Sequence, residues 1–281
     1  MLRRNSARAD VRPSPIAGTW YPGTADALGA AIDDFLSNVP SQELSGQLLG
    51  LVAPHAGYIY SGQVAAYAYR LIQGQSRDRV VVLSPCHDLY SGRFLVSARD
   101  YATPLGVVPI DQETIEKLGE HIPITRLAND REHSLEIQLP FLQRTLGDFS
   151  LVPVMLQNQS WQDCQDLAEA LDHVLGEERP LLVASTDLCH AHDYAQVRST
   201  DADTLAALDS GDAQHFWKTA GARHGACGFG AVTTVLLTAQ RWGAEQVHIL
   251  HHTNSGDVTG QRSGYVVGYA AAAIVGSRQG S

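Results

Sequence analysis

The 281-residue sequence predicts an α/β fold, with a single domain in which helices cover both faces of a central mixed sheet. Short apolar runs alternate with segments whose apolar residues recur at helical spacing, which is typical of a sheet buried between helices. No linker, repeat or low-complexity stretch divides the chain, and 44% of its residues are hydrophobic, enough for one large core. We expect this domain to span residues 13–276, between a flexible tail at 1–12 and a C-terminal tail at 277–281.

The first half of the chain shows both patterns. After a turn-rich segment at 15–22, Thr24 is a good N-cap for a helix over residues 25–36, where Leu28 and Ile32 recur at helical spacing. Residues 79–84 are continuous and β-branched, and Pro85 closes them, so they predict a buried strand. The same reasoning gives strands at 48–53 and 94–97, a helix from Ser61 or Gly62 to 72, and a helix that Asp111 caps and that ends at 119.

The second half repeats the alternation. A longer helix is expected over residues 133–146 and a strand over 150–156. The remaining elements follow from the same two patterns: helices at 161–175, 198–208, 212–220 and 228–242, and strands at 181–185, 246–251 and 265–272.

Composition excludes several classes of partner. The formal net charge is −10, and no Lys/Arg cluster occurs beyond the first dozen residues, which argues against nucleic acid or an anionic membrane. No apolar run reaches the length of a membrane span. The four cysteines form no CxxC pair, which fits a reducing cytosol. The basic start lacks the apolar segment of a secretion signal. It could be an organelle transit peptide, but a frayed tail fits its short length better, so we expect a cytoplasmic protein.

Three predicted strands end in loops that carry histidine. The first runs into Pro54-His55, the second into Pro85-Cys86-His87, and the third into Thr186-Asp187-Leu188-Cys189-His190. Ligands of α/β folds bind at the carboxyl ends of strands, so we expect His55, His87 and His190 to share one rim. A single loop histidine is more often a surface or hydrogen-bonded residue, but three at equivalent places are hard to explain by packing.

Cys227 stands at the start of the predicted helix at 228–242, in the segment Gly225-Ala226-Cys227-Gly228-Phe229-Gly230. The exposed N–H groups of a helix start lower the pKa of a thiol, and thiolate is the form that ligates a metal or attacks an electrophile. Alternatively, the glycines only allow close helix packing, and the cysteine is a small apolar filler. The local sequence leaves both interpretations open. The glycines are not a dinucleotide motif, because they follow no strand.

Two further pairs of polar residues are spaced i, i+3. Asp187 and His190 suit a carboxylate–imidazole pair for proton transfer or metal support. Alternatively, Asp187 caps the next helix and His190 is exposed. His133 and Glu136 lie at a predicted helix start, where a solvated charged surface is the simpler interpretation of the spacing alone.

Six short motifs run in a fixed order through almost the whole chain. They are Ala17-Gly18-Thr19-Trp20-Tyr21-Pro22, Ala53-Pro54-His55-Ala56-Gly57-Tyr58, Ser84-Pro85-Cys86-His87, Glu132-His133-Ser134-Leu135-Glu136, Ser185-Thr186-Asp187-Leu188-Cys189-His190 and Ala226-Cys227-Gly228. In this combination and order the chain resembles the Memo family, which includes a component of the microbial AmmeMemoRadiSam system. Each motif is short, but six in sequence are highly specific.

The resemblance implies a fold similar to that of class III, non-haem iron extradiol dioxygenases. It also implies one transition metal ion, iron or copper, bound at the positions of His55, His87 and Cys227. The related dioxygenases use two histidines and a glutamate, so the cysteine is a departure that weakens the inference of ring-cleaving activity. A thiolate is a softer donor than a carboxylate and shifts the preference toward copper(I), zinc or a redox-tuned iron.

The same resemblance implies residues for proton transfer. The family's nearby aspartate and histidine fall on Asp187 and His190, and its Glu-His-Ser segment falls on the residues from His133 to Glu136. His190 is then the expected base, held by Asp187, and His133 is a second candidate near a bound ligand.

Three functions remain open on these grounds. The first is a metal-dependent oxidoreductase for a small-molecule or peptide-borne substrate, for which the resemblance implies a radical-SAM protein and an AMMECR-type protein as partners. The second is a non-catalytic module that holds copper or iron or binds other proteins, favoured by the cysteine in the third ligand position. The third is a metal-free cysteine nucleophile at Cys227, with His190 as its base. An oligomer is possible, since α/β enzymes of this size are commonly dimers.

Overall fold

The computed structural model describes residues 11–42 and 44–277 of the chain. The predicted tail segments at 1–10 and 278–281 lie outside the described residues. Val11 and Arg12, which the sequence placed in the N-terminal tail, instead form strand β1 (Val11–Arg12), and Arg12 is only 1% exposed. The tail prediction was therefore wrong for these two residues, because their partners lie far away in the sequence.

The core of the molecule is a nine-stranded mixed sheet with the order β10-β12-β2-β9-β3-β8-β4-β7, in which β11 also pairs with β12. Its centre is parallel, since β2, β9, β3 and β8 run in one direction, and β12 pairs with β2 in the antiparallel direction. The strands are β2 (Gln47–Ala53), β3 (Arg79–Pro85), β4 (Phe94–Ser97), β7 (Ile124–Leu127), β8 (Ser150–Leu156), β9 (Leu181–Ser185), β10 (His190–Asp193), β11 (Ala244–Asn254) and β12 (Ser263–Gly276).

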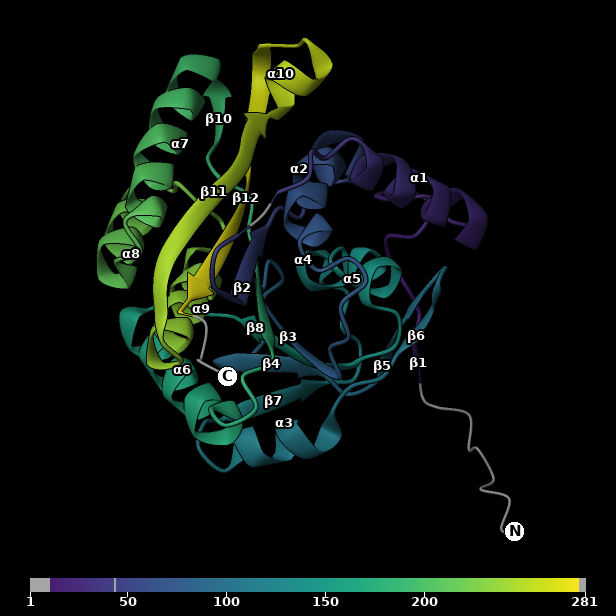
Figure 1. Cartoon of the computed structure of the whole chain (residues 1–281), viewed down its shortest axis with the longest axis vertical. Helices are drawn as coiled ribbons and strands as arrows, with labels where there is room; N and C mark the ends of the chain where they lie inside the picture. The colour runs from purple at the N-terminus through teal and green to yellow at the C-terminus, as the bar shows by residue number, and fades with distance from the viewer. Residues whose placement is uncertain (1–10, 43, 278–281) are drawn as a thin grey trace.

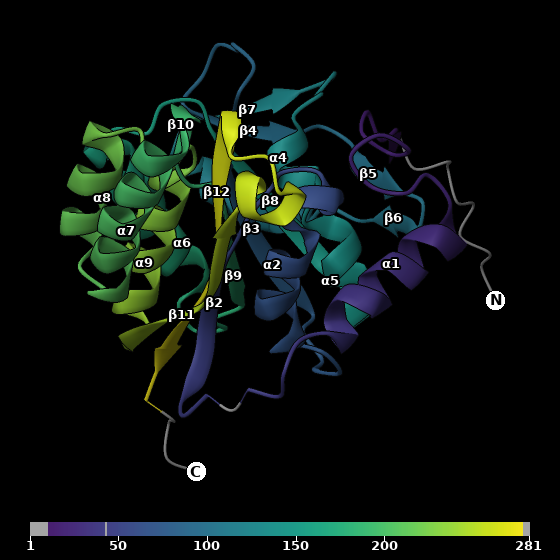
Figure 2. The ribbon, with the colours of Figure 1, turned by 90° about the horizontal axis from the view of Figure 1, so that it is seen from above.

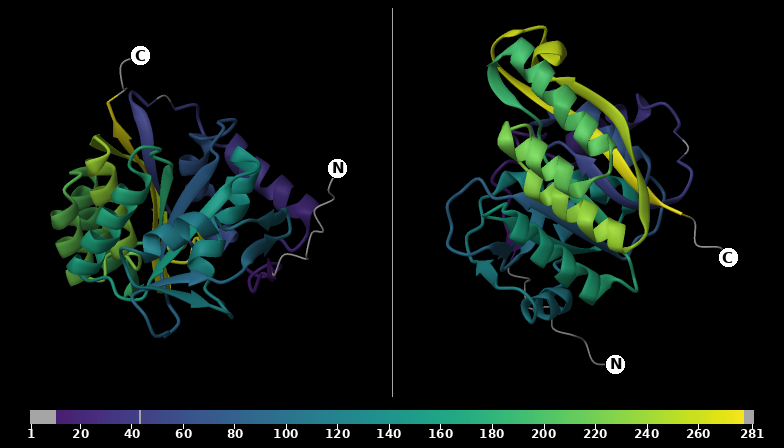
Figure 3. Two further views of the ribbon diagram at one scale, coloured as in Figure 1. Left: turned by 90° about the horizontal axis from the view of Figure 1, so that it is seen from below. Right: turned by 90° about the vertical axis from the view of Figure 1, so that its left-hand side faces the viewer.

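Helices cover both faces of this sheet, as the sequence predicts. Figure 2 shows one group of helices on the left of the sheet and another on the right. The first group comprises α6 (Trp161–Leu175), α7 (Tyr194–Asp209), α8 (Ala213–Ala222) and α9 (Phe229–Arg241). The second comprises α1 (Ala25–Ser37), α2 (Tyr58–Arg70) and α5 (Leu139–Leu146). The left view in Figure 3 shows the same layered arrangement.

Smaller elements lie around this core (Figure 1). Strand β1 pairs in parallel with β5 (Asp100–Thr103), which pairs with β6 (Gly106–Val108) in a second, three-stranded sheet. The short helices are α3 (Gln112–Gly119), α4 (His133–Glu136) and α10 (Ser255–Thr259). No helix in the described part of the chain is long and apolar enough to cross a bilayer.

Most predicted elements are confirmed, and local capping explains several of them. Thr24 accepts a hydrogen bond from the backbone N–H of Ala27 at the start of α1, and Asp111 accepts one from Thr114 at the start of α3. The strands at 94–97, 150–156 and 181–185 and the helix at 161–175 have the predicted bounds. Continuous β-branched runs and capped periodic segments are thus decided locally.

Helix α7 begins at Tyr194, four residues before its predicted start. Two other helices differ from the prediction for identifiable reasons. The helix expected at 133–146 is divided into α4 and α5, and Pro140 lies in the first turn of α5. Proline has no N–H to donate to the carbonyl four residues earlier, so it cannot continue α4. Helix α2 begins at Tyr58, before the predicted Ser61 or Gly62, because the N–H of Tyr58 donates to the carbonyl of Trp20, 2.8 Å away. That partner belongs to a distant segment, which local patterns do not reveal.

Candidate metal centre

The loops that follow β2, β3 and β9 lie side by side at one edge of the sheet. Strand β9 pairs in parallel with both β2 and β3, so the carboxyl ends of the three strands meet there. His55 follows β2, His87 follows β3, and Asp187 follows β9. The predicted rim is therefore formed by the loops that carry His55, His87 and Asp187, whereas His190 lies at the start of β10.

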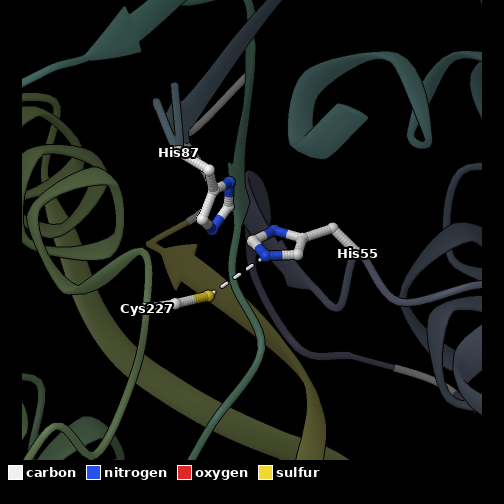
Figure 4. A group of neighbouring side chains, drawn as sticks. All are labelled: His55, His87 and Cys227. Carbon is white, nitrogen blue, oxygen red and sulfur yellow. Dashed lines mark hydrogen bonds between the residues drawn. The ribbon is translucent and has the colours of Figure 1, made fainter. Parts of the chain in front are cut away.

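His55, His87 and Cys227 converge on one point at this rim (Figure 4). The Sγ atom of Cys227 lies 3.1 Å from Nε2 of His55, and one donor atom from each of the three residues lies within 4.8 Å of the others. Zinc, for comparison, binds imidazole nitrogen at about 2.0 Å and thiolate at about 2.3 Å. Donors around a single ion are therefore a few ångströms apart, and these three residues could hold one ion.

The backbone around Cys227 places its sulfur in the cleft. The N–H of Cys227 donates to the carbonyl of Asp187 at 3.1 Å, and Sγ accepts a hydrogen bond from the N–H of Asp187 at 3.3 Å. A Cβ on Gly228 would lie 2.4 Å from the carbonyl oxygen of Ser185. Gly228 therefore does allow close packing, as one of the two interpretations suggested. The thiol of Cys227 nevertheless points toward His55.

The predicted fall in the pKa of Cys227 is not observed. Burial raises the pKa of this thiol well above its usual range, and the nearby Asp187 raises it further. Three interactions oppose this rise: hydrogen bonds with the backbone of Asp187, with the side chain of Thr186 and with the backbone of Cys227 itself. A metal ion would have to displace the thiol proton on binding.

A buried hydrogen-bond chain orients the imidazole of His55. Ser185 Oγ donates to the carbonyl of Ser134 and accepts from Gln138 Nε2 at 2.7 Å. His55 Nδ1 lies 3.0 Å from the same Oγ. Because the hydroxyl proton is directed at Ser134, Nδ1 of His55 is the donor to Ser185, and its Nε2 lone pair faces Cys227. This is the orientation that a metal ligand requires.

Glu132 orients His87 in the same manner. Its Oε1 lies 3.0 Å from Nδ1 of His87, and its Oε2 accepts the backbone N–H of His87. Burial alone would lower the pKa of His87, but the hydrogen bond and charge of Glu132 outweigh burial and raise it. Conversely, burial favours the neutral acid at Glu132, yet the hydrogen bond from His87 keeps the carboxyl pKa far below its usual range. Nε2 of His87 is left free to face the cleft.

His133 also faces the cleft, which contradicts the solvated helix start suggested by its spacing. Its ring lies 4.3 Å from the ring of Trp20 and 4.8 Å from that of His87. Burial lowers its pKa to about 4. His87, Glu132 and His133 form a second group close enough to hold a cation. However, Glu132 already accepts the backbone N–H groups of His133 and Ser134, so we interpret it as a positioning carboxylate.

Glu136, the other half of that predicted pair, is buried instead of solvated. It forms an ion pair with Arg12 and accepts a hydrogen bond from Tyr21 Oη at 2.7 Å. Arg12 also pairs with Asp130, whose carboxylate accepts from Tyr101 Oη at 2.9 Å. We call these five residues the Arg12 cluster. Arg12 also donates from Nη2 to the backbone carbonyl of Glu132, 2.8 Å away. Glu132 is the residue whose carboxylate orients His87.

Asp187 and His190 do not form the predicted pair. Asp187 Oδ1 accepts the backbone N–H groups of His55 and Ala56, at 2.7 and 3.3 Å, so it holds the turn that carries the first ligand candidate. Burial raises its pKa to about 7. His190 lies on β10, is exposed, and has Nδ1 3.1 Å from Tyr265 Oη. The expected support of His190 by Asp187 was therefore wrong, as was the helix-capping alternative for Asp187.

A cleft of about 580 Å³ opens beside the three ligand candidates. His133, Asp187 and His190 all line it, so the predicted proton-transfer residues do share one cavity with His55 and His87. The sequence did not reveal Glu132 or Ser185 as site residues. Both residues open a recognised motif, Glu132 directly before His133 and Ser185 two residues before Asp187, and this was the available signal; otherwise Ser185 looks like an ordinary strand residue.

Comparisons with known proteins agree on one family. A family model described as Memo-like protein matches residues 12–273. A MEMO1 family protein of Nitrosopumilus maritimus is 31% identical and covers 93% of this chain and 98% of its own length. Relatives with the same description in Thermoplasma acidophilum and Thermotoga neapolitana are each 35% identical, with 92% and 94% of this chain and 97% and 99% of their own length covered.

Among solved structures, an uncharacterized protein of Escherichia coli K12 aligns with a TM-score of 0.49 and 15% sequence identity, over 79% of this chain and 99% of that one. The family assignment rests on the sequence matches alone, and the family model extends over nearly the whole domain, from residue 12 to residue 273. The chain belongs to the Memo family.

Proposed function

We propose that this protein binds one transition metal ion, iron or copper, through His55, His87 and Cys227 and acts as a non-haem metal-dependent oxidoreductase. The observation that carries the proposal is the convergence of three donors, two of them oriented by side-chain hydrogen bonds, beside an open cleft. Membership in the Memo family supports the expected likeness in fold to class III extradiol dioxygenases.

The donor set fits such an ion. Two imidazoles and one thiolate leave at least one coordination position free, and the cleft lies next to it. When bound, the metal would supply redox chemistry and Lewis acidity at that position. Iron and copper both suit this mixed set of donors, and zinc is a third option.

The surrounding residues have distinct tasks in this proposal. His133 is neutral near pH 7, because burial lowers its pKa to about 4, so its imidazole can accept a proton from a bound ligand. His190 is a second base at the outer side of the cleft, oriented by Tyr265. Asp187 lines the cleft and fixes the backbone of His55, and its Oδ2 lies 4.0 Å from Nε2 of His55.

Anaerobic reconstitution tests the proposal. The metal-free protein would be titrated with Fe(II) and separately with Cu(I), and O₂ uptake would then be followed with candidate aromatic and peptide substrates. We expect one ion per chain, and we expect Cys227→Ala to lose most of the affinity while Cys164→Ala, a buried cysteine away from the donors, retains it. Unchanged affinity in Cys227→Ala would show that the ligand set is wrong.

A second candidate function is a non-catalytic module that holds copper or iron or binds other proteins. The cysteine in the third ligand position favours it, since a soft thiolate suits Cu(I) storage. Tight Cu(I) binding without metal-dependent turnover would support this function over the oxidoreductase.

A metal-free cysteine nucleophile is the weakest of the three functions. Burial raises the pKa of Cys227, so little reactive thiolate is expected near neutral pH. His190, the base assigned to it from the sequence, hydrogen-bonds Tyr265. Metal analysis of freshly purified protein and labelling with a thiol reagent separate this function from the others.

The context of the reaction is also part of the proposal. We infer that the protein works in the cytoplasm on a small-molecule or peptide-borne substrate, and that a radical-SAM protein and an AMMECR-type protein act with it in an AmmeMemoRadiSam-type system. Family membership supports this context. Co-purification from the native cell would test it.

A further inference from the structure

A second cavity lies on the opposite side of strand β12 from the candidate metal centre. It has a volume of about 470 Å³ and opens between α7, the end of β11 and α10 (Figure 1). Val267 and Tyr269 line the metal cleft, whereas a Cβ on Gly268 between them would lie 2.0 Å from the carboxyl group of a residue that lines the second cavity. Successive residues of a strand face opposite sides of a sheet, so β12 separates the two cavities. We call the second one the α7 cavity, and its lining includes Tyr194, Arg198, Asp201, His252, Asp257 and Arg262.

Arginine distinguishes the α7 cavity from its neighbours. Arg198 and Arg262 line it, whereas four other cavities in the described part of the chain, the metal cleft among them, have neither Lys nor Arg in their lining. The two guanidinium groups lie 5.9 and 5.1 Å from the centre of the Tyr194 ring, which is the distance of a cation–π contact. Two cations are therefore held beside one aromatic ring, although the protein as a whole carries a formal net charge of −10.

Only one of these two cations is balanced by a carboxylate. Asp257 forms an ion pair with Arg262, 2.8 Å away. The same carboxylate also accepts hydrogen bonds from Tyr194 Oη and Asn254 Nδ2, so its oxygens are occupied. Arg198 has no ion pair or hydrogen bond with any of residues 11–42 and 44–277. The guanidinium group of Arg198 is therefore available to a ligand.

Asp201 adds a buried carboxyl group to the lining. Its side chain is 6% exposed, and its Oδ1 accepts the N–H of Cys189 at 2.9 Å. Its Oδ2 has no hydrogen-bond partner among the residues that the structure describes. Burial raises the pKa of Asp201 to about 7, and a bound anion nearby would raise this pKa further. Around and below neutral pH, this carboxyl is therefore a neutral hydrogen-bond donor and does not repel an anion.

We propose that the α7 cavity binds a small organic anion and holds its carboxylate or phosphate group through Arg198. Guanidinium is especially suited to these anions, because its N–H groups can pair with two oxygens at once. A volume of about 470 Å³ also has room for the organic part of the ligand. The inference goes beyond the proposed function and does not require a metal ion.

The charges around the α7 cavity depend on the protonation of Asp201. When Asp201 is protonated, the two arginines exceed the remaining carboxylate, that of Asp257, by one positive charge. His252 adds to this excess when it is protonated. Ionisation of Asp201 cancels the excess contributed by the arginines, so the affinity for an anion should fall as the pH rises through about 7.

Four compounds built on one skeleton test the proposal: glycerol 3-phosphate, glycerate, glycerol and 3-amino-1,2-propanediol. Binding to the full-length protein would be followed by calorimetry, and the ¹⁵N–¹H amide shifts would locate the site. We expect both anions to bind at least about ten-fold more tightly than the neutral and the cationic compound. The largest shift changes should fall on residues 194–202 of α7 and residues 252–254 of β11.

Arg198→Gln removes the proposed anion-binding group. Because Arg198 has no polar partner among the described residues, the midpoint of thermal unfolding should not change, whereas the affinity for both anions should fall about ten-fold. The matched control is Arg241→Gln, an exposed position on α9 that lines neither the α7 cavity nor the metal cleft. This control should bind both anions as tightly as the wild type.

The pH dependence gives a second, independent measurement. The charge of glycerate is constant between about pH 6 and 8, so a several-fold loss of its affinity over this range reports on the protein. Asp201→Asn keeps an uncharged donor and should lose most of this pH dependence, with the remainder due to His252. An equal pH dependence in the variant and the wild type would overturn the role given to Asp201.

Several other outcomes would overturn the anion site as a whole. These are tight binding of glycerol, equal affinity in the wild type and Arg198→Gln, and shift changes confined to the metal cleft. Failure of either anion to bind at about 10 mM would have the same consequence. None of these outcomes depends on whether His55, His87 and Cys227 bind a metal ion, so the inference and the proposed function fail separately.

Discussion

The two walls of the cleft are built in contrasting ways. On the α4 side, Glu132 and the Arg12 cluster are buried, and hydrogen bonds or ion pairs occupy their charged groups. On the β10–β12 side, His190 and Tyr265 are exposed and hydrogen-bond each other, and the ring of Tyr265 also contacts that of His192. The contrast indicates that the α4 wall fixes the metal ligands, whereas the β10–β12 wall is free to adapt to a ligand. Buried polar networks are rigid when all their members are satisfied, and the predictions below test this division.

The largest expected effect is on the Arg12 cluster. Arg12→Met leaves the carboxylates of Asp130 and Glu136 buried without their cation, so we expect a loss of about 3–5 kcal/mol in the free energy of unfolding. The control is Arg144→Met, which breaks an ion pair with Asp33 whose side chains are half-exposed and should cost about 0–1 kcal/mol. Denaturant titration measures both. Similar losses in the two variants would mean that the buried ion pairs of Arg12 contribute no more to the free energy of unfolding than an exposed pair.

The stability of the protein should depend on pH through Asp201, a residue of α7 that is hydrogen-bonded to the backbone just before β10. Asp201 is 6% exposed and accepts the N–H of Cys189, and burial raises its pKa to about 7. The unfolded carboxyl loses its proton near pH 4, so between about pH 4 and 7 the folded state binds a proton that the unfolded state lacks. The stabilising contribution of Asp201 is therefore complete below pH 4 and is lost as the pH rises to about 7.

The free energy of unfolding of the wild type and of Asp201→Asn would be measured between about pH 4 and 7, and the value for the variant subtracted from that of the wild type. We expect the difference to fall by up to about 4 kcal/mol from pH 4 to 7. Asp203→Asn, an exposed position on the same helix, should show no such slope. A rising or flat difference for Asp201→Asn would contradict the role assigned to burial.

Metal affinity should depend on Glu132. Glu132→Gln weakens the hydrogen bond that orients His87, so we expect the affinity for Zn(II) or Co(II) to fall about 10- to 100-fold. The exposed Glu113→Gln serves as the control. The ¹⁵N chemical shifts of His87 in the metal-free protein give a readout separate from activity, because loss of the carboxylate should release the fixed tautomer. An unaltered tautomer together with unaltered affinity would remove Glu132 from the positioning role.

The smallest effect is expected on the opposite wall. Tyr265→Phe removes the hydroxyl that contacts His190, yet both residues are exposed, so stability should change by less than about 0.5 kcal/mol. Metal affinity should stay within about two-fold of wild type. A large loss of affinity would show that the β10–β12 wall also positions the metal ligands and would end the distinction between the walls.

The positions of the first two ligand candidates could be predicted from the sequence. His55 and His87 each follow an apolar strand, and the carboxyl ends of neighbouring parallel strands meet at one edge. The third candidate was different, because local sequence left Cys227 equally explained by packing. Only the family resemblance connected it to the histidines, and the structure brings all three together.

The sequence by itself determined the central strands and most helices, because periodicity and capping act over a few residues. It did not predict β5, β6, β7 or β10, and it gave β11 and β12 too few residues. It did not determine the partners of the polar side chains. Arg12 meets Glu136 across 124 positions, and Asp187 holds His55 instead of the neighbouring His190. Those contacts depend on the strand order β2-β9-β3 and on the path of the N-terminal segment, which only the tertiary structure decides. A buried charge needs a partner, but the partner can be any residue that the fold brings close, so the spacing of residues in the sequence does not predict it.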